Sequence, residues 1–257
     1  MNPLHRTLIE KAGYDHGFEH VLPGDADTVV LASARHRAQV AVSVGAKGYV
    51  VGLQGGSTSL LSELERSFAA WGRSGAAFVA PTEAALAQWL RRAAALSQAL
   101  PNQAVTDYEA QVQQALAALP ANTVQNTEVQ RMVRQRVGQQ TFRQAMLDYW
   151  GGACAVTGLA LPQALRASHA KPWAECASDA ERLDVFNGFL LSANLDALFD
   201  QFLISFTDEG KLLISSQIKV ADAQALGLSD SLCLRWVASH HMDYLAYHRK
   251  RFEATTD

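Results

Sequence analysis

Two aspartates four residues apart, Asp196 and Asp200, have the side-chain type and the spacing that could bind a metal ion. They lie in a short segment, 193–200, that is predicted to be helical, and Asn194 near its start is predicted to cap it. Residues four apart share one helix face, and two carboxylates there are hard oxygen ligands of the kind that Mg²⁺ binds. Most such pairs are only surface acids, so the neighbouring residues must decide between the two interpretations.

A histidine and an asparagine precede the aspartates and extend the candidate site. His169 lies in 165–173, predicted as a strand, and Asn187 opens the next predicted strand after a long acidic loop. The unperturbed pKa of an imidazole is near neutrality, so His169 could accept a proton at cellular pH as a general base. Taken alone, His169 would more often be a core histidine and Asn187 a turn residue before Gly188.

In this order the residues resemble the HNH nuclease family, whose core is a ββα-metal motif of two strands and a helix around one divalent ion. The resemblance extends over roughly 126–252, about half of the chain. Several short motifs in the right order make it specific, although each one would be weak alone. They are Gly138-Gln139, Phe142-Arg143, 154–158, Ser168-His169, Lys171-Pro172-Trp173, Asn187-Gly188, Asp196, Leu198-Phe199-Asp200, the hairpin 203–214 and the terminal 244–249.

The resemblance implies a role for each matched residue. His169 takes the position of the general base, and Asn187 takes the middle position, where its amide would orient the imidazole. Asp196 and Asp200 would bind one divalent ion, with Mg²⁺ expected first and Mn²⁺ or another divalent ion as the alternative. The chain departs from the pattern at Ser168, where many such enzymes carry an acid or a histidine ligand. The cysteine pairs that hold structural zinc in many HNH domains are also absent, so no structural zinc is expected.

Arginines interrupt the apolar pattern of a long predicted helix, 128–149. Between 128 and 143 there are four arginines against one glutamate, which leaves a local net charge of +3. Guanidinium groups suit phosphate oxygens, although a charge run is more often a solvated face. The candidate DNA-binding residues, including three from the matched motifs, are Arg131, Arg134, Arg136, Arg143, Lys171 and Arg249.

The overall composition fits a globular protein of one large or two ordinary domains. The 257 residues are 49% hydrophobic and 18% charged with a net charge of −3, which excludes a disordered chain and a globally basic one. Apolar runs are short and no signal-like leader opens the sequence, so we expect no membrane span and a cytoplasmic location. The three cysteines form no CxxC pair and are expected to be reduced.

The predicted fold class is α+β with two domains. An N-terminal mixed α/β sheet domain covers 1–100, a helical linker covers 101–125, and the HNH ββα-metal nuclease domain with its flanking helices covers 126–257. In the first domain three β-rich runs predict an antiparallel sheet, and Thr82 is predicted to cap a helix. These runs are 28–33, 38–44 and 48–54.

Several basic and aromatic residues of the first domain allow two interpretations. They are Arg35, His36, Arg37, Tyr49, Trp71 and Trp89. Aromatic side chains stack on exposed bases and arginines contact phosphates, so the set could form a nucleic-acid recognition surface. The alternative is that the tryptophans belong to the core.

Together these features predict a metal-dependent endonuclease that hydrolyses phosphodiester bonds in double-stranded DNA. The resemblance implies a restriction-like defence enzyme, in one version dependent on modified bases, because similar HNH domains are often fused to sensing domains. One alternative is a DNA-binding protein with a degenerate, non-catalytic core, suggested by Ser168 and Asp196. Another is a nuclease regulated by a small molecule that the N-terminal domain senses. A homodimer would let a single-site motif cut both strands.

Overall fold

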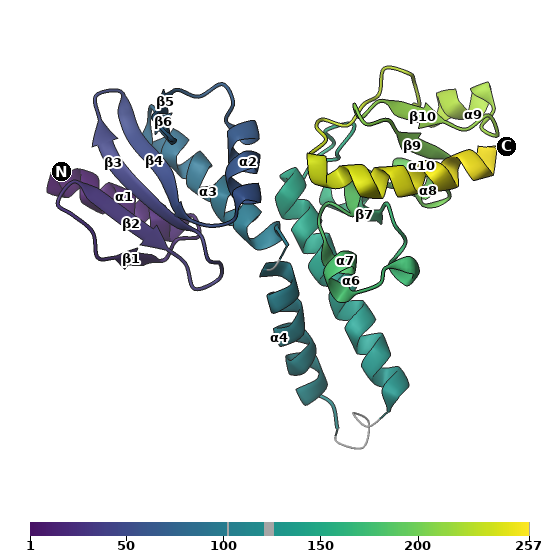
Figure 1. Ribbon diagram of the computed structural model, residues 1–257, viewed down its shortest axis with the longest axis horizontal. Coiled ribbons are helices and arrows are strands. Elements are labelled where there is room, and N and C mark those ends of the chain that lie inside the picture. The colour runs from purple at the N-terminus through teal and green to yellow at the C-terminus, as the bar shows by residue number, and fades with distance from the viewer. Residues whose placement is uncertain (102, 121–125, 257) are drawn as a thin grey trace. The chain divides into compact units, whose positions relative to one another are not determined.

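The computed structural model describes residues 1–101, 103–120 and 126–256 (Figure 1). Contacts within the chain divide it into two compact units, Met1–Gln103 and Ala104–Asp257. Helices and strands are mixed along the chain, consistent with the predicted α+β class. None of the described helices is both long and apolar enough to cross a membrane.

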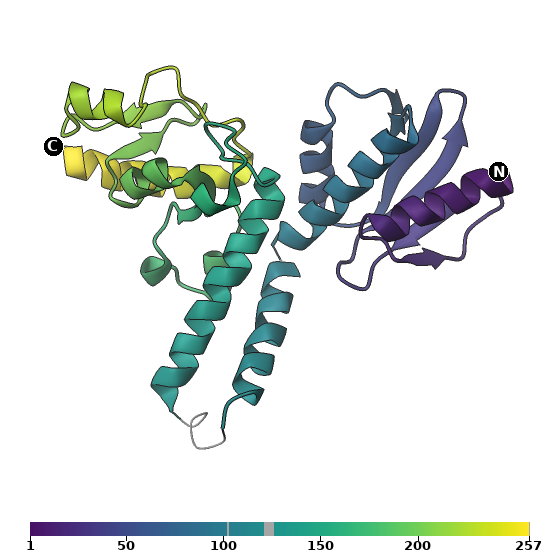
Figure 2. The same cartoon turned by 180° about the vertical axis from the view of Figure 1, so that it is seen from behind.

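The first unit is built around a six-stranded sheet with the strand order β1-β2-β3-β4-β6-β5. Every neighbouring pair is antiparallel, which confirms the predicted pairing of the three β-rich runs. Helices α1 and α3 pack on one face of the sheet (Figure 2). The elements are α1 (Pro3–Asp15), β1 (His20–Leu22), β2 (Thr28–Ala32), β3 (Gln39–Gly45), β4 (Gly48–Gly55), α2 (Thr58–Ser67), β5 (Arg73–Ser74), β6 (Ala77–Ala80) and α3 (Glu83–Ala99).

Most aromatic side chains of that set belong to the core of the first unit, and Trp71 is half-buried at its edge. Trp89 and Tyr49 are buried, and Trp71 packs against Phe68 with ring centroids 4.5 Å apart. His36 is buried as well, with its Nε2 3.1 Å from the carbonyl oxygen of Gly17. The interpretation of these aromatics as a nucleic-acid recognition surface is therefore wrong, because their rings fill the space between sheet and helices. Of that set, the two arginines are exposed.

The second unit combines two small antiparallel hairpins with a layer of helices. β7 pairs with β8, and β9 pairs with β10. The predicted long helix is α6, which begins after its cap Asn126 and ends at Gly151, where φ is +66°. The elements are α4 (Gln103–Ala117), α6 (Thr127–Trp150), η1 (Pro162–Ala164), β7 (Leu165–His169), η2 (Trp173–Glu175), α7 (Asp179–Leu183), β8 (Gly188–Ser192), α8 (Ala193–Asp200), β9 (Ile204–Phe206), β10 (Leu212–Ile214), α9 (Val220–Ala225), η3 (Ser239–His241) and α10 (Met242–Thr256).

Helix α4 packs along α6 within the second unit. Ala104, Tyr108 and Val112 recur every four residues and are buried, and the Tyr108 hydroxyl donates to the carbonyl oxygen of Arg134 at 3.3 Å. This apolar stripe gives α4 a packing role, whereas the sequence suggested a linker between two domains. Of the expected linker, residues 102 and 121–125 lie outside the described residues.

The buried His248 on α10 makes the stability of the second unit depend on pH. Its Nε2 donates to the carbonyl oxygen of Phe199 at 3.0 Å, and its Nδ1 accepts from the Ser205 hydroxyl at 2.9 Å. Burial lowers the pKa of His248 to about 4. Between this value and the unfolded value of about 6.5, only the unfolded chain gains the proton, so acid favours unfolding.

We predict that the unfolding free energy contributed by His248 falls by up to about 3 kcal/mol as the pH drops from 7 to 4. Urea unfolding of the wild type and of His248→Gln over this range measures the difference between the two pH dependences. Other buried groups titrate equally in both proteins and cancel. Parallel stability curves for the two proteins would contradict the assignment of this loss to His248.

Candidate active site

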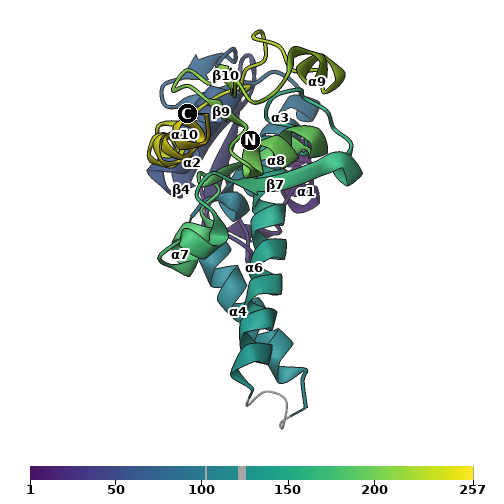
Figure 3. The ribbon, with the colours of Figure 1, turned by 90° about the vertical axis from the view of Figure 1, so that its right-hand side faces the viewer.

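The site is formed by the β7–β8 hairpin and the helix α8 that follows it without a loop. β7 contacts α8 and α6, which lie on either side of it (Figure 3). In the hairpin His169 lies opposite Gly188 and Ser168 opposite Phe189. The strands approach so closely that a Cβ atom on Gly188 would lie 2.0 Å from the carbonyl oxygen of Ser168. Glycine is therefore required at this point of the hairpin.

His169 is held in one orientation by three neighbours. Its ring stacks on Phe142 of α6 at 3.8 Å between centroids, and it meets the ring of Trp173 edge-on at 5.7 Å. Its Nε2 lies 2.9 Å from the carbonyl oxygen of Arg182. A carbonyl only accepts, so Nε2 carries the hydrogen, and the neutral ring has its lone pair on Nδ1.

Burial lowers the pKa of His169 from its ordinary value, against a smaller opposing effect of the hydrogen bond to Arg182. The lowered pKa keeps the imidazole neutral to more acidic pH than a free histidine. A neutral imidazole with Nδ1 unprotonated is the form that can accept a proton from water.

Asn187 is fully buried and clamps the loop between the two strands. Its Oδ1 accepts from the backbone N–H of Lys171 at 2.8 Å, and its Nδ2 donates to the carbonyl oxygen of Glu181 at 3.1 Å. Among the described residues this amide makes no hydrogen bond to the imidazole, because its atoms are used by the loop, so its expected orienting effect on His169 is not a direct contact. Glu181 directly precedes Arg182, so Asn187 acts on His169 through the segment that carries the Arg182 carbonyl group.

Asp196 is joined to the strand that carries His169. Its Oδ1 accepts a hydrogen bond from the hydroxyl of Ser168, which is only 1% exposed. Burial raises the pKa of the Asp196 carboxyl, the Ser168 hydrogen bond lowers it, and the negative charge of Asp200 raises it again. Sequence reasoning treated Ser168 only as a missing ligand. The structure gives it a contact that aligns α8 with β7, and no sequence signal beyond its place next to His169 points to this.

Asn194 does not cap α8 as predicted. The helix begins at Ala193, and the residue at its cap position is Ser192, two residues before Asn194. Asn194 instead accepts from the Ser192 hydroxyl at 2.7 Å and donates through Nδ2 to the carbonyl oxygen of Leu226 at 3.0 Å. Its amide therefore ties the start of α8 to the end of α9.

Comparison with known families now bears on this hairpin and helix. Residues 154–207 match the family model described as HNH endonuclease. The hairpin and α8 therefore lie within a segment whose sequence is that of an HNH endonuclease domain. It contains His169, Asn187, Asp196 and Asp200, so the predicted family is confirmed over the strands and helix of the site. A search of curated proteins found no match to the chain.

The acidic residues of the HNH segment suit a sparsely bound divalent ion. Among the described residues, no group of three or more His, Cys, Asp or Glu side chains is arranged to hold a metal ion. Asp196 and the exposed Asp200 supply two carboxylates one helical turn apart. Mg²⁺ usually keeps several waters and takes one or two protein carboxylates, so this pair fits Mg²⁺, whereas zinc sites need three or four protein ligands.

The six candidate DNA-binding residues fall into two groups. Arg143 donates to the carbonyl oxygen of Leu165 at 2.8 Å, Lys171 pairs with Glu181 at 2.6 Å, and Arg249 pairs with Asp208 at 2.6 Å. Their charged groups stabilise the strand start, the loop and the second hairpin, which does not support their assignment to phosphate contacts. Within the part of the chain that the structure describes, the exposed Arg131, Arg134 and Arg136 make no hydrogen bond or ion pair through their guanidinium groups.

The C-terminal helix α10 fixes the active-site loop from outside. The hydroxyl of Tyr244 donates to Asp184 at 3.1 Å, and Arg251 pairs with Glu175 at 2.9 Å. Just before this helix, His241 is fully buried with its ring stacked on a core phenylalanine, which gives it a structural role.

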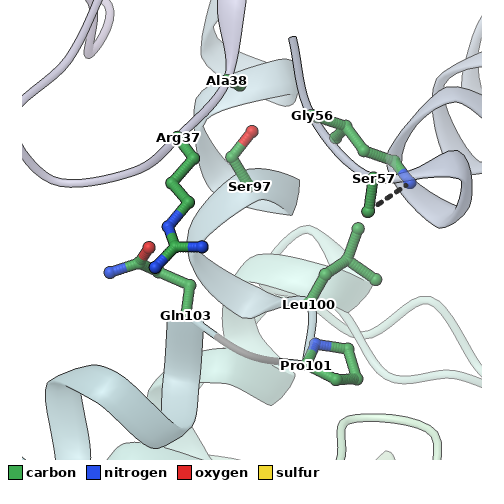
Figure 4. A pocket seen from close by; sticks show the side chains of 9 residues that line it. Arg37, Ala38, Gly56, Ser57, Ser97, Leu100, Pro101 and Gln103 are labelled. Atoms are coloured by element: carbon green, nitrogen blue, oxygen red, sulfur yellow. Dashed lines mark hydrogen bonds between the residues drawn. The ribbon is translucent and has the colours of Figure 1, made fainter.

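The first unit contains a cavity of about 280 Å³ beside the N-terminus of α2 (Figure 4). Arg37 is the charged side chain in its lining, and Figure 4 shows its guanidinium group directed toward Gln103. Two of the other polar side chains are used by their own helices, because Ser57 caps α2 and the Ser97 hydroxyl donates to the carbonyl oxygen of Ala93. This cavity is where the small-molecule alternative would have to place its ligand.

We predict that Asn187→Ala lowers the unfolding free energy by about 2–4 kcal/mol, because it leaves several buried backbone groups without partners. Asn194→Ala is the matched control, since its amide is exposed and makes one backbone contact, and it should cost about 1 kcal/mol or less. Urea unfolding measures both. Equal, small losses in the two variants would contradict the clamping role of Asn187.

Proposed function

We propose that this protein is a metal-dependent endonuclease that hydrolyses phosphodiester bonds in double-stranded DNA. The observation that carries the proposal is the state of His169 within the HNH match. Its Nε2–H is committed to the carbonyl oxygen of Arg182, so that Nδ1 is the proton acceptor. In the family that the sequence resembles, the residue at this position is the general base.

In the proposed reaction, Nδ1 of His169 takes a proton from a water molecule that attacks the phosphorus atom in line. The stacking on Phe142 and the hydrogen bond to Arg182 keep the imidazole from turning during this transfer. Asp196 and Asp200 would hold a divalent ion, which when bound stabilises the negative charge that develops on the phosphate. The expected products carry a 5′ phosphate and a 3′ hydroxyl.

We also propose a biological role, that of a restriction-like defence enzyme. In this role the first unit either recognises DNA, in one version through modified bases, or mediates assembly. The support for this is the architecture alone, since a sheet unit without an assigned motif precedes the HNH segment. A homodimer would provide one such site for each DNA strand.

A second candidate function is a DNA-binding protein with a non-catalytic core. The observation that favours it is Ser168, which stands where many related enzymes carry a ligand and whose hydroxyl binds one oxygen of Asp196. The two functions differ in whether DNA cleavage occurs and depends on divalent ions and on His169. Incubating DNA with the wild-type protein or His169→Ala, in the presence of Mg²⁺, Mn²⁺ or EDTA, distinguishes the two functions.

We predict that His169→Ala lowers the cleavage rate by about a hundredfold to ten-thousandfold while DNA binding changes little, since the base is lost and the phosphate contacts remain. His240→Ala is the matched control, because it removes an exposed imidazole of the same unit. Cleavage of plasmid DNA by the folded variants measures the effect. Wild-type cleavage by His169→Ala would refute the assignment of the base.

We predict that Asp196→Asn and Asp200→Asn each weaken divalent-ion binding by about tenfold or more, because even the loss of an outer partner of a metal ligand commonly costs that much. Calorimetric titration of the protein with Mn²⁺ in the absence of DNA measures the affinity without relying on activity. Asp222→Asn removes an exposed acid from α9 and should leave the affinity unchanged. If both site variants bind Mn²⁺ with wild-type affinity, the two aspartates are ordinary surface acids and not metal ligands.

A further inference from the structure

A second cavity, of about 420 Å³, lies in the second unit between α4, α6 and the loop that carries η2 and α7. Figure 1 shows α4 running beside α6 and α7 lying against α6. The side chains that matter here are Tyr108, Arg131, Arg134, Trp173, Asp179 and Arg182. The cavity therefore joins the arginine-bearing helix to the loop beside His169.

The cavity has an excess of positive charge. Arg182 is fully engaged, because its guanidinium group donates to the carbonyl oxygens of Trp173 and Cys176 and pairs with Asp179 at 3.0 Å. That pair cancels the one acidic charge in the lining. Arg131 and Arg134 lie three residues apart on one side of α6, exposed and without protein partners among the described residues. Two free guanidinium groups at a cavity favour an anionic ligand, and the oxygens of a phosphate suit the forked geometry of such groups.

The lining favours a phosphate over a nucleobase. The indole of Trp173 lies against Gly138, where an added Cβ atom would come within 2.4 Å of the ring. The Arg182 guanidinium group lies 5.8 Å from the centre of the same indole. The protein thus already contacts the tryptophan ring, and the charged groups left to a ligand are the two arginines, with the amide of Gln135 beside them.

The cavity lies on the same face of α6 as Phe142, the residue on which His169 stacks. Arg134, Gly138 and Phe142 follow one another at intervals of four residues, so they line one side of α6. Phe142 stacks on His169, and Trp173 contacts both Gly138 and His169. The free arginines therefore lie on the same helix against which His169 of β7 packs.

The spacing along α6 sets a distance that can be compared with DNA. A helix rises about 1.5 Å per residue, so Arg134 and Arg131 lie about 12 and 16 Å along the axis from Phe142. A DNA strand advances about 3.4 Å per nucleotide. If a DNA strand follows this helix face, the arginines lie about three to five nucleotides from the position of His169, the proposed general base.

We propose that this cavity is a phosphate subsite for the strand that is cut, and that it holds a phosphate about three to five nucleotides to one side of the scissile one. The inference rests on the proposed nuclease function. Beyond it, the inference gives Arg131 and Arg134 a role that Arg136 does not share. Arg136 is exposed on the same helix and lies outside the lining of the cavity.

Phosphate-ethylation interference tests the position. DNA that carries about one ethylated, neutral phosphate per molecule is cut by the wild type, by R131Q/R134Q and by R136Q, and the cut molecules are sequenced. In the wild type we expect ethyl groups to be depleted at the scissile phosphate and again about three to five phosphates away on one side. The second depletion should disappear in R131Q/R134Q and persist in R136Q. A pattern that is identical in the wild type and the double variant, or that R136Q also erases, would overturn the proposal.

A binding measurement separates failure of the subsite from failure of the nuclease. In EDTA, the logarithm of DNA affinity falls linearly with the logarithm of salt concentration, by about 0.9 for each phosphate contact. We expect R131Q/R134Q to reduce this slope by about 0.9 relative to the wild type, because the subsite holds one phosphate. If the wild type cuts no DNA with Mg²⁺ or Mn²⁺, the nuclease is refuted, yet the reduced slope would still support the phosphate site. An unchanged slope would overturn the subsite whether or not the protein cuts DNA.

Discussion

The close approach of β7 and β8 at Gly188 is the constraint on which the site depends. A side chain at this position would meet the backbone of Ser168, so the hairpin closes only around glycine. This closure sets His169 opposite Gly188 and brings the preceding Asn187 into the interior. An amide buried there must find partners, and it finds them in the backbone at both ends of the loop. Gly188 thus determines where His169 and Asn187 lie and which path the loop between the strands follows.

The loop between the two strands is stabilised from both ends and from outside. Asn187 joins its beginning to its end, the Arg182 side chain binds carbonyl groups of the loop, and α10 contacts it through Tyr244 and Arg251. A loop with so many committed polar groups loses little further entropy when a substrate arrives. The carbonyl group that orients His169 is part of this fixed segment, so the imidazole proposed as the base is oriented before any substrate binds.

Local patterns predicted the parts of the molecule whose partners are close in sequence. The alternating apolar residues of 38–44 predicted a strand of the sheet, and the order of His169, Asn187 and Asp196 predicted the ββα unit. Long-range pairings were not predictable in this way. The partner of Arg249 is Asp208, more than forty residues away, and no local pattern distinguishes such a paired arginine from the free Arg134. The same limit explains Trp89, since a tryptophan in a core and one on a surface look alike until the sheet that covers it is known.

The alternation of side chains along β7 separates the two functions of the site. Ser168 faces α8, where its hydroxyl binds Asp196, and His169 faces α6, where its ring stacks on Phe142. Among the described residues, the contacts that hold His169 involve neither aspartate. His169 is therefore oriented by α6 and the loop, and the candidate metal ligands are carried by α8, while a single strand keeps both in register. A slip of one residue in this strand would exchange the two faces, which makes the pairing of His169 with Gly188 as important as the residue types themselves.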